Sequence, residues 1–343
     1  METKISIRTD LAFEAVDGRQ LQNQSDVINE DLDFKNVKIK KTTIKENAAN
    51  ELGRKAGVYY LIDISKTNIH DTDDLRNIED SITMVLKELL SSEGITLQSK
   101  GLIVGLGNDN VTPDSLGPLV VENVIVTRHI FMLGEEVSEG ISNVSAIAPG
   151  VMGNTGIETS DIINAVIEKI DVDYVIAVDA LASSSISRVN RSIQITNTGI
   201  SPGSGVGNKR KELSKEVLNI PVIAIGVPTV VDAVTITANT IDYLLRYFNK
   251  KVQEGNKESD RLVLSEKTNF EETSLPDERY TEHFLGQFGM LSEQQKASLI
   301  HSVLTPNGLN MMVTPKEIDI DISDLAEVIS SAIDRSLHTI VQP

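Results

Sequence analysis

The chain has 343 residues, of which 40% are hydrophobic, so it can bury a large core in one or two domains. Lysine and arginine total 32 against 50 aspartate and glutamate residues, and the resulting net charge of −18 is not typical of a nucleic-acid-binding protein. There is no cysteine, which excludes disulfide bonds, thiolate catalysis and cysteine zinc sites. No stretch resembles a signal peptide or a transmembrane helix, so we expect a cytoplasmic protein with no membrane partner.

The first hundred residues combine a polar start with β-structure and one helix. Residues 1–34 are polar and predict an ordered tail or a short strand. Residues 35–66 contain alternating and β-branched apolar positions, which predict strands. Residues 78–92 have apolar side chains at helical spacing.

Between residues 101 and 250, short apolar runs alternate with glycine-rich loops and amphipathic helices. Helices are predicted to begin near Leu116 and near Asp232, and another is predicted to be capped by Thr159 or Ser160. This recurrence predicts an α/β fold, with a largely parallel doubly wound sheet flanked by helices and an additional N-terminal β segment. The predicted core strands are 102–104, 144–148, 174–178, 193–196 and 222–225.

The last hundred residues begin with a charged stretch, 249–287, that has no helical or strand pattern and predicts a polar insertion. Residues 292–304 and 322–338 return to helical spacing. Since no repeat or linker is visible, we expect these helices to complete a single α/β domain.

Two acids, Asp114 and Asp179, each come directly after a predicted core strand. Neighbouring strand ends of such a sheet converge on one crevice, where these fold classes place their chemistry. Two carboxylates that share a crevice can divide one proton, so that one acts as a base and the other as an acid. The alternative is structural: Asp114 as a helix cap and Asp179 as a turn residue.

Other chemistries remain open from the residues alone. Two aspartates could hold a divalent ion with a third ligand, but the histidines show no pairing and no His-Glu-x-x-His motif. The glycine loops could cradle a phosphate or nucleotide in a non-hydrolytic protein, although none matches a complete phosphate-binding motif. The basic run 209–211 could pair with substrate carboxylates or form a solvated helix start.

Several long motifs, in order and over nearly the whole chain, resemble the germination protease family of spore-forming bacteria, which is similar in fold to hydrogenase-maturation endopeptidases. The motifs are 111–118, 149–159, 178–181, 202–210 and 312–317.

The resemblance implies an endopeptidase that begins the degradation of small acid-soluble spore proteins in the spore core when the spore germinates. It implies a homotetrameric zymogen that processes itself, with no cofactor and no direct nucleic-acid partner. The family's catalytic aspartates correspond to Asp114 and Asp179. We expect substrate to be bound by Gly153, Asn154, Lys209 and Arg210.

The family's substrates are cut after an acid and before an apolar residue, with alanine and another acid nearby. Residues 9–14, Thr-Asp-Leu-Ala-Phe-Glu, resemble such a site, so self-cleavage is expected between Asp10 and Leu11. This divides the chain into a propeptide, 1–10, and a peptidase domain, 11–343.

The related hydrogenase-maturation enzymes bind a metal partly through a histidine after an Ile-Ser-Pro triplet. Here the triplet 200–202 is followed by Gly203. This favours the carboxylate pair, with a metal-dependent endopeptidase in the same crevice as the alternative.

Overall fold

The computed structural model describes residues 9–16, 24–134, 137–201, 211–254, 273–304 and 311–341. The chain forms two compact units. The larger contains Thr9–Ser183, Ser187–Val230 and Thr314–Pro343, and the smaller contains Val231–Val313 with Ser184–Ile186. Each unit is described separately below.

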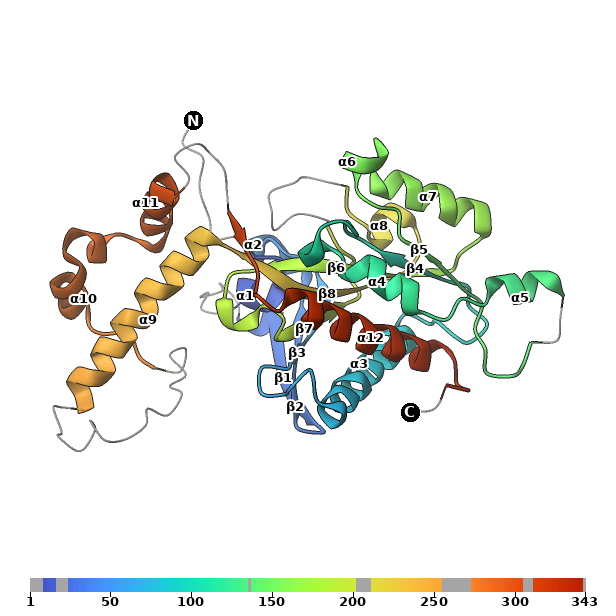
Figure 1. The fold of residues 1–343 in the computed structure, drawn as a ribbon, viewed down its shortest axis with the longest axis horizontal. Coiled ribbons are helices and arrows are strands. Elements are labelled where there is room, and N and C mark those ends of the chain that lie inside the picture. The colour runs from blue at the N-terminus through green and yellow to red at the C-terminus, as the bar shows by residue number, and fades with distance from the viewer. Residues whose placement is uncertain are drawn as a thin grey trace. The chain divides into compact units, whose positions relative to one another are not determined.

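The larger unit is built on one sheet with helices on both faces (Figure 1). The strands are β1 (Val27–Phe34), β2 (Val37–Ile44), β3 (Gly57–Asp63), β4 (Gly101–Gly105), β5 (Val144–Ile147), β6 (Tyr174–Ser183), β7 (Ser192–Thr196) and β8 (Val222–Asp232). The helices are α1 (Ala12–Val16), α2 (Glu46–Leu52), α3 (Thr72–Ser92), α4 (Leu116–Asn123), α5 (Arg128–Leu133), α6 (Met152–Thr155), α7 (Thr159–Ile170), α8 (Lys215–Leu218) and α12 (Ile318–Leu337). Short 3-10 turns are η1 (Gln24–Asp26), η2 (Thr112–Asp114) and η3 (Ile186–Arg188).

The strands follow the order β1-β2-β3-β7-β8-β6-β4-β5. Strand β4 pairs in parallel with both β5 and β6, and this parallel part is the core predicted from the sequence. From β8 outward, β7, β3, β2 and β1 pair in antiparallel fashion. The structure thus confirms an α/β fold with a parallel core and an N-terminal β segment, and shows that this segment extends the same sheet.

The two faces of the sheet are covered by different helices. Helices α3, α4 and α12 cover one face, where Ile82, Ile176 and Ile329 are fully buried in the main core. Helix α7 covers the parallel strands on the other face through Ile163. On that same face, α1 and α2 cover the antiparallel strands, with Leu52 in the shared cluster. The fold therefore leaves the strand ends between these helices as the place for a site.

Three features of the larger unit differ from the sequence expectation. Strand β6 continues beyond Val178 to Ser183, because the Asp10 N–H donates to the Ala182 carbonyl at 3.0 Å and gives this end a backbone partner. Helix α2 interrupts the predicted β region. The N-cap of helix α7 is Glu158 and not Thr159 or Ser160, so Thr159 is the first residue of the helix. The Thr159 hydroxyl instead donates to the Gly150 carbonyl at 3.2 Å.

The smaller unit consists mainly of helices: α9 (Ala233–Glu254), α10 (Glu278–Leu285) and α11 (Glu293–Leu304), with the turn η6 (Gly286–Met290) and the short strand β9 (Met312–Val313). Val234, Ala297 and Ile300 form its buried cluster. The expectation of no helix over 249–287 is wrong at both ends, because α9 extends to Glu254 and α10 begins at Glu278. The ring of Phe248 stacks on that of Phe284, with centroids 5.2 Å apart, which joins these two helices. The centre of the stretch, 255–272, lies outside the described residues.

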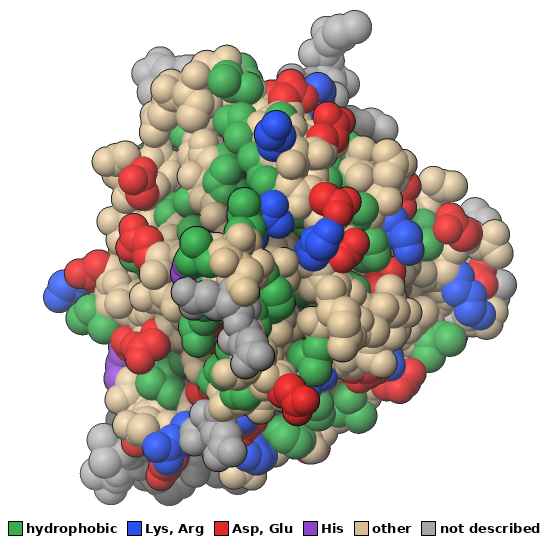
Figure 2. All heavy atoms as spheres, turned by 90° about the vertical axis from the view of Figure 1, so that its right-hand side faces the viewer, with side chains coloured by type: hydrophobic (Ala, Val, Ile, Leu, Met, Phe, Trp, Pro, Cys, Tyr) green, Lys and Arg blue, Asp and Glu red, His purple; other side chains and the backbone are tan. Residues whose placement is uncertain are grey.

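None of the helices in the described ranges is both long and apolar enough to cross a bilayer. Figure 2 shows acidic and basic side chains interspersed over one face of the molecule. That arrangement differs from the continuous basic surface through which proteins commonly contact nucleic acid.

Candidate active site

Asp114 is the last residue of η2, in the connection from β4 to α4. Two close backbone contacts shape this connection. A Cβ on Gly105 would lie 2.1 Å from the Gly117 carbonyl oxygen, so only glycine allows the end of β4 to approach α4 this closely. The Asn108 N–H donates to the Asp114 carbonyl at 2.9 Å and closes the loop. Asp114 is thereby held, half-buried, by a tightly packed backbone.

Asp179 lies on β6, one residue beyond the last pair of the β4–β6 ladder, where Gly105 lies opposite Val178. Its side chain is 4% exposed. One carboxylate oxygen accepts the backbone N–H of Ala180 at 3.0 Å. Asp179 is therefore a buried residue within a strand and not the turn residue of the structural alternative.

The two aspartates lie on neighbouring parts of the chain: Asp179 on β6, and Asp114 in the connection that follows its parallel partner β4. The turn η2, which carries Asp114, packs against β6, which carries Asp179. The Thr229 hydroxyl of β8 donates to the Pro113 carbonyl at 2.6 Å and ties the same turn to the strand on the other side of β6. The turn that carries Asp114 is thereby fixed beside the strand that carries Asp179.

The segment with the predicted cleavage site lies along the far end of β6. Asp10 and Ala182 exchange two hydrogen bonds: the Asp10 N–H donates to the Ala182 carbonyl at 3.0 Å, and its carboxylate accepts the Ala182 N–H at 2.9 Å. Leu11 is fully buried. The Asp10–Leu11 bond and Asp179 are thus associated with the same strand.

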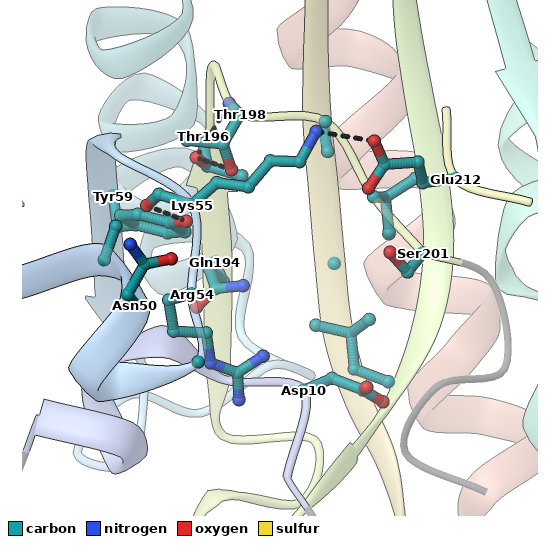
Figure 3. Close-up of a pocket in the computed structure, with 17 residues that line it drawn as sticks. Asp10, Asn50, Arg54, Lys55, Tyr59, Gln194, Thr196, Thr198, Ser201 and Glu212 are labelled. Atoms are coloured by element: carbon teal, nitrogen blue, oxygen red, sulfur yellow. Dashed lines mark hydrogen bonds and ion pairs between the residues drawn. The ribbon is translucent and has the colours of Figure 1, made fainter. Parts of the chain in front are cut away.

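A cavity of about 460 Å³, lined by both polar and apolar residues, opens beside Asp10 (Figure 3). Its floor is the sheet and its walls are α2 with the following Arg54 and Lys55 on one side and residues 199–201 with Glu212 on the other. The remaining polar lining residues are Asn50, Tyr59, Gln194, Thr196 and Thr198. A cavity with these donors and acceptors suits a peptide rather than an apolar ligand.

Lys55 closes one side of this cavity by ion pairs to Glu212 at 2.7 Å and Glu216 at 2.6 Å. Burial acts to lower the pKa of Lys55, but the two carboxylates outweigh it and the net shift is upward. The same contact lowers the pKa of Glu216 to about 2. Lys55 and Glu216 are therefore both charged at neutral pH. Their ion pair, with that of Glu212, links the residues after α2 to α8 and the residues before it.

The predicted substrate-binding residues divide into two sets. Gly153 and Asn154 lie on the exposed helix α6, and the Asn154 amide approaches the Asn108 side chain at 3.5 Å, which brings α6 beside the loop that holds Asp114. Lys209 and Arg210 lie outside the described residues. The third residue of that basic run, Lys211, pairs with Asp161 at 2.8 Å.

Sequence reasoning missed the polar side chains that contact the segment 9–14, among them Arg54, Arg188 and Gln194. They come from the end of α2, from η3 and from β7. No motif marks them, because only the antiparallel half of the sheet brings these separate segments together. Within the described ranges, no group of three or more His, Cys, Asp or Glu side chains is arranged to hold a metal ion.

A family model and the curated relatives of the chain give the same family. The family model described as germination protease matches residues 8–343. Germination proteases of Bacillus cereus (strain AH187) and Bacillus mycoides (strain KBAB4) are each 51% identical to the chain, over 98% of its length and 95% of theirs. A solved NiFe hydrogenase maturation protease, HycI from Thermococcus kodakarensis, is 19% identical over 42% of this chain and 80% of its own, with a TM-score of 0.27. The chain is an endopeptidase and belongs to the germination protease family.

Proposed function

We propose that the chain starts the degradation of small acid-soluble spore proteins at germination, and that Asp114 and Asp179 form its water-activating pair. The observation that carries this proposal is that η2, which ends in Asp114, packs against β6, the strand that carries Asp179 and pairs in parallel with β4. Two carboxylates that share a site repel each other when both are ionised, so in this proposal they hold one proton between them.

In this mechanism the ionised carboxylate orients a water molecule and removes its proton as the oxygen attacks the scissile carbonyl. The protonated partner donates to the amide nitrogen as the bond breaks. Since the first group ends protonated and the second ionised, the pair is ready for another cycle after one proton moves between them.

We further propose that the protein is made as a homotetrameric zymogen in the cytoplasm of the spore core and removes a propeptide, residues 1–10. The support is the family together with the position of the Asp10–Leu11 bond against β6. Gly153 and Asn154, beside the Asp114 loop, and the basic residues Lys209 and Arg210 are proposed to bind the substrate.

The test is a pair of isosteric substitutions, Asp114→Asn and Asp179→Asn. In the Asp179→Asn variant the amide oxygen can still accept the hydrogen bond from the Ala180 N–H, so we expect the fold to be retained. Each variant should lose at least about 100-fold in cleavage of a small acid-soluble spore protein, since a general acid or base contributes about 10²–10⁴-fold. Circular dichroism verifies folding. Full activity of either variant would refute the carboxylate pair.

A further inference from the structure

The segment Thr9–Glu14 occupies a groove of the larger unit in which nearly every residue has a dedicated contact. Its main chain is held on both sides of Asp10. Arg54 donates from one guanidinium nitrogen to the Thr9 carbonyl at 2.7 Å and to the Leu11 carbonyl at 3.3 Å. The Ala12 N–H donates to the Gln194 side-chain oxygen at 2.7 Å. These contacts use only backbone groups of the segment, so they do not depend on its side chains; the segment is non-helical up to Leu11 and enters α1 at Ala12.

The side chains of the segment are also recognised individually. Leu11 joins Leu61 and Leu181 in one apolar cluster and is fully buried. Ala12 is likewise fully buried, which leaves no volume for a larger residue. The groove is therefore selective for an apolar residue followed by a small one.

The acid at position 14 has its own partners. The Ser183 hydroxyl donates to the Glu14 carboxylate at 2.7 Å, and the Arg188 Nε lies 3.4 Å from the same oxygen. The Glu14 side chain is only 5% exposed, so its charge requires this compensation. The Arg188 guanidinium also lies 4.8 Å from the centre of the Phe13 ring, so one arginine contacts two successive residues of the segment.

The groove lies next to the proposed catalytic pair. Asp179 and Leu181 are two residues apart on the same face of β6, a separation of about 7 Å. Leu11 packs in the cluster of Leu181, and Asp10 bonds to Ala182, so the Asp10–Leu11 bond lies along the part of β6 that directly follows Asp179.

We propose that this groove is the subsite that recognises polypeptide around the cleaved bond, and that Arg188 is a specificity-determining residue that requires an acid four positions after the scissile acid. The Ala182 backbone reads the acid before the bond, Leu61 and Leu181 read the apolar residue after it, and Arg188 with Ser183 reads the second acid. This inference rests on the proposed self-processing, in which the chain's own segment 9–14 is the occupant.

The test is a charge exchange between positions 14 and 188, with self-cleavage of the full chain followed by mass spectrometry. Arg188→Glu and Glu14→Arg should each slow cleavage by at least about tenfold, because two like charges then meet in a buried site. The double variant Glu14→Arg/Arg188→Glu should recover to within about threefold of the parent, since the pair is restored with its charges exchanged. Arg191→Glu, a charge reversal three residues away, serves as the control and should keep the parental rate.

The outcomes separate this inference from the proposed function. Parental rates in both single variants, or a double variant no faster than the slower single one, would overturn the role of Arg188. Melting temperatures of all variants show whether a slow rate reflects unfolding; a fully folded but slow single variant, rescued by the exchange, is not explained by a structural role. If the parent chain itself is never cleaved at Asp10–Leu11, the proposed self-processing fails instead.

Discussion

The backbone of Gly107 lies directly against Asp114: a Cβ at position 107 would be 2.0 Å from the Asp114 carbonyl oxygen and 3.3 Å from its carboxylate. Gly107 also has a φ of +116°, which side-chain-bearing residues rarely adopt. The loop after β4 is therefore fitted to the acid that it surrounds, and the position of Asp114 depends on the absence of a side chain at Gly107.

From this contact we predict that Gly107→Ala displaces Asp114 and lowers peptidase activity by about 100-fold, the loss expected when a reacting group moves by about 1 Å. The backbone oxygen cannot move without breaking the hydrogen bond from the Asn108 N–H. Cleavage of a spore protein measures activity, and thermal unfolding measures stability.

The matched control is Gly94→Ala. Gly94 also has a positive φ, +73°, but a Cβ there meets nothing within 4 Å. It therefore carries the conformational strain, of order 1–3 kcal/mol, without the contact to Asp114. Comparable activity losses in the two variants would show that strain alone, rather than displacement of Asp114, is responsible.

A second prediction separates the carboxylate pair from the metal-dependent alternative. A pair that shares one proton supplies both the base and the acid, so cleavage should keep its parental rate after exhaustive dialysis against a chelator. Metal content by mass spectrometry is measured on the same sample. Loss of activity on chelation, with recovery on adding one divalent metal, would contradict the prediction and favour a metallopeptidase.

The parallel core could be predicted from the sequence because its strands are buried on both faces and appear as continuous apolar runs, such as Leu102–Val104 and Tyr174–Val178. The same pattern drew attention to Asp179, which directly follows the run Tyr174–Val178, and to Asp114, in the connection after Leu102–Val104. The local sequence pattern is sufficient to predict a residue's place in the fold wherever a single strand and the loop after it determine that place.

The groove could not be predicted in this way. Arg54, Gln194 and Arg188 are separated in sequence from the segment that they contact by more than a hundred residues or by two intervening strands. The end of β6 was also missed, because Asp179–Ser183 contains polar residues whose partners come from the segment 9–14. Long-range pairing of this kind leaves no periodic signal in either segment.

A third prediction concerns the processed protein. Cleavage in the groove should leave Leu11 as the first residue, because the backbone on both sides of Asp10 is fixed by Arg54 and Ala182. Intact mass and N-terminal sequencing of the matured chain measure this directly. Leu11→Lys should abolish processing at this bond, since a charge in the Leu61–Leu181 cluster has no partner. A mature chain that begins at any other residue would refute the assignment.

A fourth prediction concerns stability and pH. Asp334 on α12 is 6% exposed, and its carboxylate accepts the Ile125 N–H at 3.0 Å. Burial raises the pKa of Asp334 to about 6, against the opposing effect of that hydrogen bond. The folded protein thus binds this proton more tightly than the unfolded chain, whose aspartates titrate near about 3.9. The contribution to stability is therefore present below about pH 4 and is lost as the pH rises through about 6.

Asp334→Asn should remove this loss, since the amide oxygen still accepts the Ile125 N–H and carries no charge. We expect the variant to be more stable than the parent by up to about 3 kcal/mol at about pH 7.5, with the difference vanishing near about pH 4. His338, one turn further on, is 2% exposed, and burial lowers its pKa. Its contribution to stability is therefore lost as the pH falls, whereas that of Asp334 is lost as the pH rises. Because His338 is present in both proteins, the comparison cancels its effect to first order. Urea unfolding at both pH values measures the difference, and Asp31→Asn, at an exposed position on β1, is the control. An Asn variant that is no more stable than the parent at the higher pH would show that the Asp334 carboxylate is not destabilising when ionised.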